Sequence, residues 1–287
     1  MTAPSGTKNP AGPVPWRAVV TMALVALAVA ESSAEAVSSD RLGAAGGATN
    51  TAPQAAVEKL NFPGVTINVQ ERCVDVDGSV CLHRGVLELV ACTKGTKEHE
   101  SIVAIEAKPR HLHAALLLLG AKPGSPARRQ QPGEDSEQWF DVPPSGGPVD
   151  VFLVLKDNEG KSVEHPISEF IAPSNKRSGR SARADKSAQF PTHTFLFAGS
   201  VLYGDGPGPR RYLSDESGNV ISLSTFGDEV LCLPAIHSQD AEALLWQVNP
   251  ADLPAIGSNV TLRLRPQRLP AAKAFQTHPP AAGKGPP

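Results

Sequence analysis

The densest run of side chains able to do chemistry lies at residues 93–101, where two lysines, two glutamates, a histidine and a serine stand between two apolar runs. Because a strand is predicted on each side of it, we expect this segment to be the tip and descending arm of a hairpin. Loops on a rigid scaffold commonly present functional groups. In an extended chain His99 and Ser101 point to one face, while Glu98 and Glu100 point to the other. A serine nucleophile needs its base within about 3 Å and an acid behind that base. Side chains at alternate positions of one strand splay apart, so the local sequence favours a solvated hairpin end with paired charges over a catalytic triad.

Three functions are compatible with this segment. The first is a non-enzymatic binding or structural module that presents six side chains to a small ligand or an exported protein: Lys94, Lys97, His99, Glu100, Ser101 and His111. The second is a hydrolase in which His99 is the general base and Lys97 stabilises negative charge. In that hydrolase Glu100 or Ser101 assists, and further partners come from Asp205, Asp215 or His193. The third is metal or redox chemistry that uses Cys92 with His99.

The surroundings of His99 separate these functions. A concave pocket that brings His99 together with an acid and a second polar group favours the hydrolase. A position of His99 on a convex rim opposes it.

The four cysteines are Cys73, Cys81, Cys92 and Cys232, an even number that allows three pairings if all are bonded. Between Cys73 and Cys81 the chain carries Asp77 and Gly78, which are typical of a hairpin turn. A three-residue loop at residues 76–78 places the two cysteines opposite each other, whereas a two-residue loop at 77–78 places them on opposite faces. We favour the three-residue loop and therefore a Cys73–Cys81 disulfide. Metal binding is the alternative, and the absence of a CxxC pair speaks against it.

His111 and His113 are two positions apart in a predicted helix. Such positions diverge by about 200°, so the two rings do not share one metal ion. We expect no metal and no cofactor.

The elements that position these residues are mostly short strands. Period-2 alternation or β-branched runs predict seven of them, at residues 65–69, 86–91, 102–106, 149–155, 195–198, 220–223 and 260–264. Turn residues at 157–160 and 215–218 indicate hairpins. One helix begins at Pro109 and ends before Gly120, and a weaker second helix covers residues 240–248. The predicted class is α+β, a mainly antiparallel sheet with one or two short helices, and an all-β sandwich is the alternative.

The chain ends have a different composition. An apolar run from Ala18 to Ala30 is too short to span a bilayer and is followed by Ala34-Glu35-Ala36, which predicts a signal peptide at 1–36. Residues 37–58 are expected to be a flexible leader, 59–269 a single domain with a basic loop insert near 173–188, and 270–287 a disordered tail rich in Pro, Ala and Gly. The mature protein is then periplasmic or extracellular, with no membrane span after processing.

Charge is nearly balanced in the chain. It has 27 Lys and Arg against 29 Asp and Glu, a formal net charge of -2. This balance excludes a dedicated nucleic-acid binder, because such proteins carry a clear excess of positive charge.

The stretch from about Val80 to Arg265 resembles the YdjY-domain family of exported bacterial proteins. The likeness rests on Val80-Cys81-Leu82, Leu87-Glu88, Cys92, residues 95–101, residues 111–124, Phe197-Ala198-Gly199-Ser200 and residues 218–223. The resemblance implies a domain of unknown function, with no established reaction, in an exported protein. Some relatives carry a ferredoxin-like label, but this chain lacks the closely arranged cysteine ligands of an iron–sulfur cluster.

Overall fold

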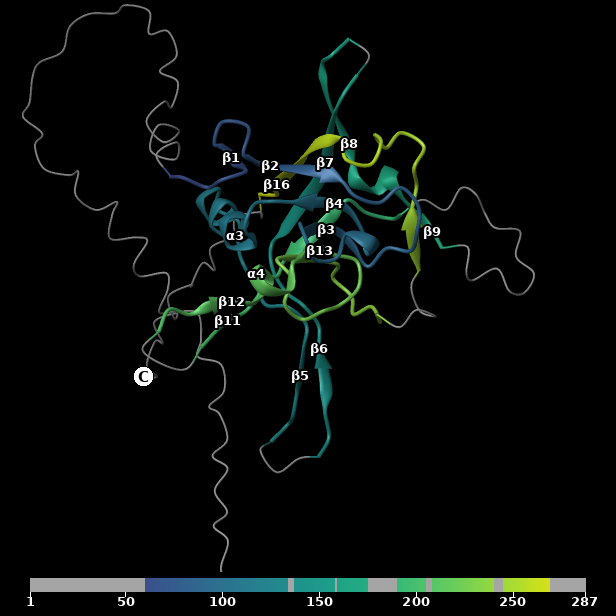
Figure 1. Ribbon diagram of the computed structural model, residues 1–287. Helices are drawn as coiled ribbons and strands as arrows, with labels where there is room; N and C mark the ends of the chain where they lie inside the picture. The colour runs from purple at the N-terminus through teal and green to yellow at the C-terminus, as the bar shows by residue number, and fades with distance from the viewer. Residues whose placement is uncertain are drawn as a thin grey trace, which may run out of the picture. The chain divides into compact units, whose positions relative to one another are not determined.

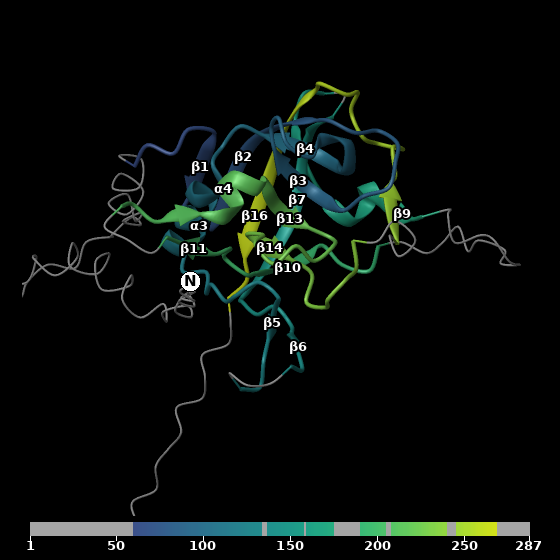
Figure 2. The same ribbon diagram turned by 60° about the horizontal axis from the view of Figure 1, so that its bottom comes forward.

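Eight strands close into a mixed β-barrel, because the last strand of the sheet, β4, pairs back with β2. The computed structural model describes residues 60–133, 137–157, 159–174, 190–204, 208–239 and 245–268. Around the barrel the order is β2 (Cys73–Val80), β16 (Asn259–Pro266), β7 (Pro148–Lys156), β10 (Thr194–Phe197), β14 (Leu231–Cys232), β13 (Asn219–Ser222), β3 (Leu89–Thr93) and β4 (Ser101–Ile105), and β4 returns to β2. Figure 1 labels six of these strands, and Figure 2 labels β10 and β14 as well. The pairs β3–β4 and β13–β14 are parallel and the other neighbours are antiparallel.

Shorter elements surround this barrel. Strand β1 (Val65–Asn68) pairs with β2, and β8 (Ser162–Pro166) pairs with β7. Three small two-stranded sheets are formed by β5 (Arg128–Gln130) with β6 (Phe140–Val142), β9 (Ile171–Pro173) with β15 (Trp246–Val248), and β11 (Leu202–Tyr203) with β12 (Arg211–Tyr212). The β5–β6 hairpin extends away from the barrel (Figure 2). Two single-turn 3-10 helices, η3 (Glu98–Glu100) and η4 (Ile167–Phe170), each lead directly into a strand.

Two short α-helices complete the described structure. Helix α3 (Pro109–Leu118) packs against β1, β2 and the second helix, α4 (Leu213–Ser217). The predicted helix beginning at Pro109 is confirmed, and Gly120 follows its end with a φ of 77°. Within the described residues, no helix is long and apolar enough to cross a membrane.

The barrel interior follows the alternation in the sequence. On β7, Val149, Val151 and Leu153 are fully buried, and on β16 Leu264 is fully buried and Leu262 nearly so. The residues between them point outward, as Asp150 and Arg263 do. The seven predicted strands are present, although β3 begins three residues later than predicted.

The predicted fold class is right in its β content and wrong in its arrangement, because the sheet closes into a barrel. The predicted hairpin at residues 73–81 is instead one continuous strand, β2, which pairs with β16 and with β4. Gly78 is needed there for close packing. A Cβ at this position would lie 2.6 Å from Val103 Cγ1 on the neighbouring strand. This strand closes the barrel, so the sandwich alternative is wrong as well.

Two further predictions need correction. The predicted helix at 240–248 is wrong at its end, where Trp246–Val248 forms β15, and residues 240–244 lie outside the described part of the chain. The predicted hairpin at 215–218 is the end of α4, whose C-cap Gly218 is left-handed with a φ of 81°. The predicted signal peptide, leader and tail, and all of the basic insert beyond Ser174, lie outside the described residues.

Candidate functional site

The polar segment at residues 94–100 crosses back over two parallel strands. Leu89 on β3 pairs with Ser101 on β4, and Thr93 pairs with Ile105, so the strands run in the same direction. The segment therefore returns from the end of β3 to the start of β4, with η3 as its last turn. The predicted hairpin is wrong here because a hairpin would make these strands antiparallel. We call residues 94–100 the crossover segment.

The predicted catalytic candidates do not converge around His99. Its side chain is 76% exposed, and Nε2 lies 3.6 Å from Glu100 Oε2. Ser101 is fully buried and its hydroxyl donates a 2.7 Å hydrogen bond to the Lys97 carbonyl oxygen. The Lys97 ammonium lies 3.6 Å from the centre of the Phe226 ring and 3.8 Å from Glu100 Oε1. The structure thus gives Ser101 and Lys97 contacts that hold the crossover segment in place.

The more distant candidates have partners of their own. Asp215, on α4, accepts a 2.9 Å hydrogen bond from the Arg110 backbone N–H and pairs with the Arg110 guanidinium at 3.1 Å. These contacts join α4 to the first turn of α3. His193 Nε2 lies 3.9 Å from Asp150 Oδ1, and its ring packs 5.2 Å from that of Phe152. Asp205 lies outside the described residues.

The predicted Cys73–Cys81 disulfide is wrong. Cys73 begins β2 and Cys81 directly follows its last residue, so a full strand, at about 3.3 Å per residue, separates them. All four cysteines are free thiols in the structure. Within the described residues, no group of three or more His, Cys, Asp or Glu side chains is placed to hold a metal ion.

The two helix histidines face different partners. The His111 ring packs 5.3 Å from that of Phe62, and burial lowers its pKa. His113 is buried, with Nδ1 at 3.0 Å from the Gly199 carbonyl oxygen and 2.9 Å from the Tyr212 hydroxyl. Burial lowers the pKa of His113 to about 4, so the ring is neutral at physiological pH.

A broad groove lies on the outer face of the barrel, with a cavity volume of about 1520 Å³. Its floor consists of outward-facing side chains from four adjacent strands, β4, β2, β16 and β7: Asp77, Ser79, Ala104, Val154, Asn259 and Thr261. Lys94 and Glu106 stand together on one wall, joined by a 2.7 Å ion pair. Lys156, whose ammonium donates a 2.7 Å hydrogen bond to the Ser162 hydroxyl, also lines the groove. Of the six predicted ligand-binding residues, Lys94 lines this groove.

Sequence reasoning missed the other groove residues. The pair Asp77-Gly78 indicates a turn, although the alternation of buried Val74 and Val76 with Asp75 and Asp77 is that of a strand with one wet face. Read as a strand, this pattern places Asp77 and Ser79 on the outer face.

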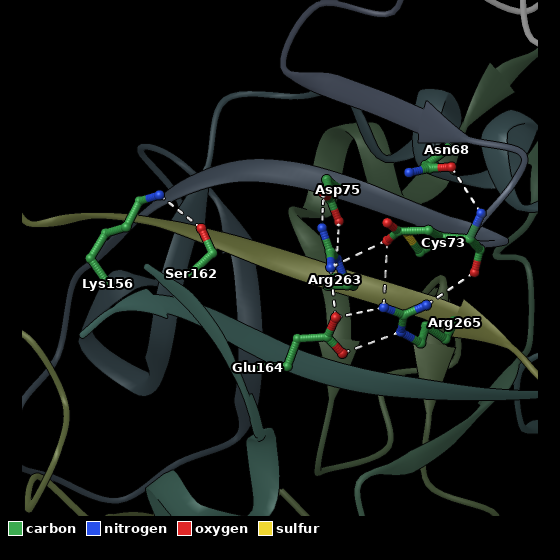
Figure 3. A network of polar contacts seen from close by, with 9 residues as sticks. Asn68, Cys73, Asp75, Lys156, Ser162, Glu164, Arg263 and Arg265 are labelled. Atoms are coloured by element: carbon green, nitrogen blue, oxygen red, sulfur yellow. Dashed lines mark hydrogen bonds and ion pairs between the residues drawn. The ribbon is translucent and has the colours of Figure 1, made fainter. Parts of the chain in front are cut away.

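A network of charges further along the same strands fixes the outer face beside the groove. Arg263 on β16 binds Asp75 on β2 through two hydrogen bonds, Nε to Oδ1 at 2.7 Å and Nη2 to Oδ2 at 2.6 Å (Figure 3). Its Nη1 donates to Glu164 Oε1 on β8 at 2.6 Å, and Arg265 Nη2 donates to the same oxygen at 2.5 Å. The network therefore joins β2, β16 and β8 across the face of the sheet (Figure 3).

Together the fold and the groove define a mixed β-barrel with a polar surface groove. The YdjY domain family matches residues 65–265, so the chain belongs to this family, a domain of unknown function. The resemblance in the sequence is confirmed, and the match begins at Val65. No curated protein and no solved structure matches the chain.

Proposed function

We propose that this YdjY domain is a non-enzymatic binding module and that the groove is its ligand site. The observation that carries the proposal is the groove itself, whose floor offers hydroxyl, amide and carboxylate groups from the adjacent strands β2 and β16. Ligand sites are typically concave, with a few polar groups that fix the orientation of the ligand. Because these groups lie on strands of a closed barrel, they are held in place before any ligand arrives.

The charges of the groove indicate the class of ligand. Lys94, Lys156, Glu106 and Asp252 all line it, so both signs are present. None of the described residues that line it has an aromatic side chain. This combination suits a small zwitterionic ligand, such as an amino acid or a short peptide, whose charged ends pair with groups of opposite sign.

The geometry gives less support to the hydrolase. His99 is largely exposed and is absent from the groove lining, and the Ser101 hydroxyl donates to a backbone carbonyl. A general base must lie within about 3 Å of the proton it removes. The same exposure of His99 weighs against a shared site with the buried Cys92.

Filling the groove tests the proposal. We expect a mixture of tripeptides to shift the backbone amide resonances of groove residues in the folded protein. In a Thr261→Trp variant the indole occupies the floor, and we expect the affinity for the same mixture to fall at least about tenfold, which corresponds to about 1.4 kcal/mol. Thr66→Trp is the matched control, because Thr66 is exposed on β1 away from the groove lining.

Two outcomes would contradict the groove as the ligand site. One is that no tripeptide shifts the groove resonances. The other is that Thr261→Trp binds the mixture as tightly as Thr66→Trp does.

We also propose that the protein is exported and acts in the periplasm or outside the cell. The support is the short apolar run at 18–30 followed by the small residues Ala34 and Ala36. Protein recovered from the periplasm or the medium is expected to begin at Val37 on N-terminal sequencing. Recovery of the intact chain with Met1 in the cytosol alone would contradict this.

A further inference from the structure

Two charged side chains on the strands of the groove have no partner of opposite charge. Within the described residues, no hydrogen bond or ion pair joins the Asp77 carboxylate to another side chain. The Lys156 ammonium donates one hydrogen bond, to the neutral Ser162 hydroxyl, which leaves two of its three donors for a ligand (Figure 3). Lys94 and Glu106, by contrast, neutralise each other on the wall. The strands therefore offer one negative and one positive charge to a ligand.

The register of the sheet sets the distance between these two charges. Asp77 on β2 lies opposite Thr261 on β16, and Thr261 lies opposite Val154 on β7. Lys156 follows two residues later on β7. Neighbouring strands are about 4.8 Å apart and each residue advances about 3.3 Å, so the Cα atoms of Asp77 and Lys156 are about 12 Å apart along a diagonal of the groove floor.

Polar side chains cover the middle of this diagonal. Thr261 and Asn259 lie on β16, on either side of the line from Asp77 to Lys156, and Ser79 on β2 lies opposite Asn259. In the described part of the chain, the side chains of Ser79, Asn259 and Thr261 have no hydrogen-bond partner. An amide side chain both donates and accepts hydrogen bonds, as a peptide backbone does. The floor between the two charges therefore matches the N–H and C=O groups of an extended peptide.

We propose that the groove holds an extended tripeptide along this diagonal, with the terminal ammonium on Asp77 and the terminal carboxylate on Lys156. The assignment rests on the proposed function of the groove and adds the length and direction of the ligand. An extended tripeptide is about 10 Å long, and the flexible stem of Lys156 covers the remaining distance. A free amino acid is only about 3 Å long, so it cannot pair with both residues at once.

A second carboxylate without a described partner, that of Asp252, also lines the groove. Asp252 is exposed on the loop between β15 and β16, whereas Asp77 is held by the pairing of β2 with β16. A group that is already fixed costs less entropy to bind than one on a loop. We therefore assign the ammonium to Asp77, and the variants below separate it from Asp252.

Blocked peptides test the two ends of the ligand separately. The full chain is titrated at neutral pH with trialanine, N-acetyl-trialanine and trialanine amide, and the affinity is measured from the backbone amide shifts of groove residues. Each block removes one charged end, so we expect each to weaken binding at least about tenfold, which corresponds to about 1.4 kcal/mol. Free alanine is expected to bind at least about tenfold more weakly than trialanine as well.

Two variants assign the ends. In Asp77→Asn, acetylation is expected to change the affinity by less than about twofold, while amidation still weakens it about tenfold. In Lys156→Met the pattern is reversed. Asp141→Asn and Lys161→Met are the matched controls, because both residues are exposed and absent from the groove lining. Both controls should respond to each block as the wild type does.

Equal affinities of the wild type for free and blocked trialanine would overturn this assignment and keep the groove as the ligand site. A response to acetylation that is lost in Asp252→Asn instead of Asp77→Asn would overturn it too. If no form of trialanine shifts the groove resonances, the proposed function fails together with the assignment. The wild-type titrations alone show whether both ends are recognised, so a variant that fails to fold does not weaken the test.

Discussion

Lowering the pH from 7 to 4 is expected to reduce the free energy of unfolding of the wild-type chain by about 3 kcal/mol more than that of a His113→Gln variant. His113 is buried between Gly199 and Tyr212, and its pKa in the folded protein is about 4, against an ordinary value of 6.5. Between these two values the unfolded chain binds a proton on His113 and the folded chain does not. Stability from the neutral ring is therefore fully present above pH 6.5 and is lost as the pH falls toward 4.

Comparison with the variant isolates this residue from other groups that titrate in the same range. Burial raises the pKa of Glu229 and of Glu88, so these carboxyls change stability in the opposite direction as the pH falls. Their contributions are common to the wild type and to His113→Gln and cancel in the difference. Glutamine keeps an amide donor for the Gly199 carbonyl, which limits the loss of stability at pH 7.

Urea unfolding at half-unit steps of pH measures the effect. His99→Gln is the control, because it makes the same substitution at an exposed position on the crossover segment. Parallel stability curves for the wild type and His113→Gln between pH 4 and 7 would contradict this prediction. They would mean that His113 binds its proton in the same pH range in the folded and in the unfolded chain.

Strands and the first helix could be predicted from the sequence because each depends on a local pattern. Along β7 and β16 every second residue is buried, so the alternation of Val149, Val151 and Leu153 with polar neighbours is sufficient. Pro109 and Gly120 likewise mark the ends of α3 without reference to the rest of the chain.

Two glycines have roles other than the turns that the local sequence indicates, and one of them lies in β2, the strand at which the barrel closes. Asp77 and Gly78 form a common turn pair, yet Gly78 lies within a strand because Val103 approaches its backbone closely. Gly218 is left-handed, a conformation common in hairpin turns, but here it caps α4. A turn and a close approach both select glycine, and only the neighbouring strand distinguishes them.

The sites also depend on contacts between distant residues. The composition of the crossover segment is evident in the sequence, but the parallel pairing of β3 with β4 is not, because no local pattern distinguishes it from a hairpin. The groove needs the register of four strands, which places Asp77, Asn259 and Thr261 on one face. Residue types were predictable, whereas their pairing required the closed sheet.

The register of β16 against β2 also places Arg263 opposite Asp75, so we expect a large loss of stability when Arg263 is replaced. Arg263→Met is expected to lower the free energy of unfolding by about 3 kcal/mol, because it leaves the carboxylates of Asp75 and Glu164 without their central cation. The side chains of Arg263, Asp75 and Glu164 are 18%, 23% and 31% exposed, so water screens these charges only in part. Methionine preserves the apolar stem, so the loss reports the hydrogen bonds and charge and not the packing.

Arg129→Met is the control for this substitution. Arg129 pairs with Asp141 on the β5–β6 hairpin, with side chains 75% and 55% exposed, and its replacement should change stability by no more than about 0.5 kcal/mol.

Acid provides a second measurement. Hydrogen bonds from Arg265 and Arg263 lower the pKa of Glu164, so its contribution is present above the pKa of the unfolded chain and is lost as the pH falls through the folded value. Because Arg263→Met removes one of these donors, its stability should fall less steeply with acid than that of the wild type. Equal losses in the free energy of unfolding for Arg263→Met and Arg129→Met would mean that the charge network does not stabilise the barrel. Strand pairing would then hold β2, β16 and β8 in place without it.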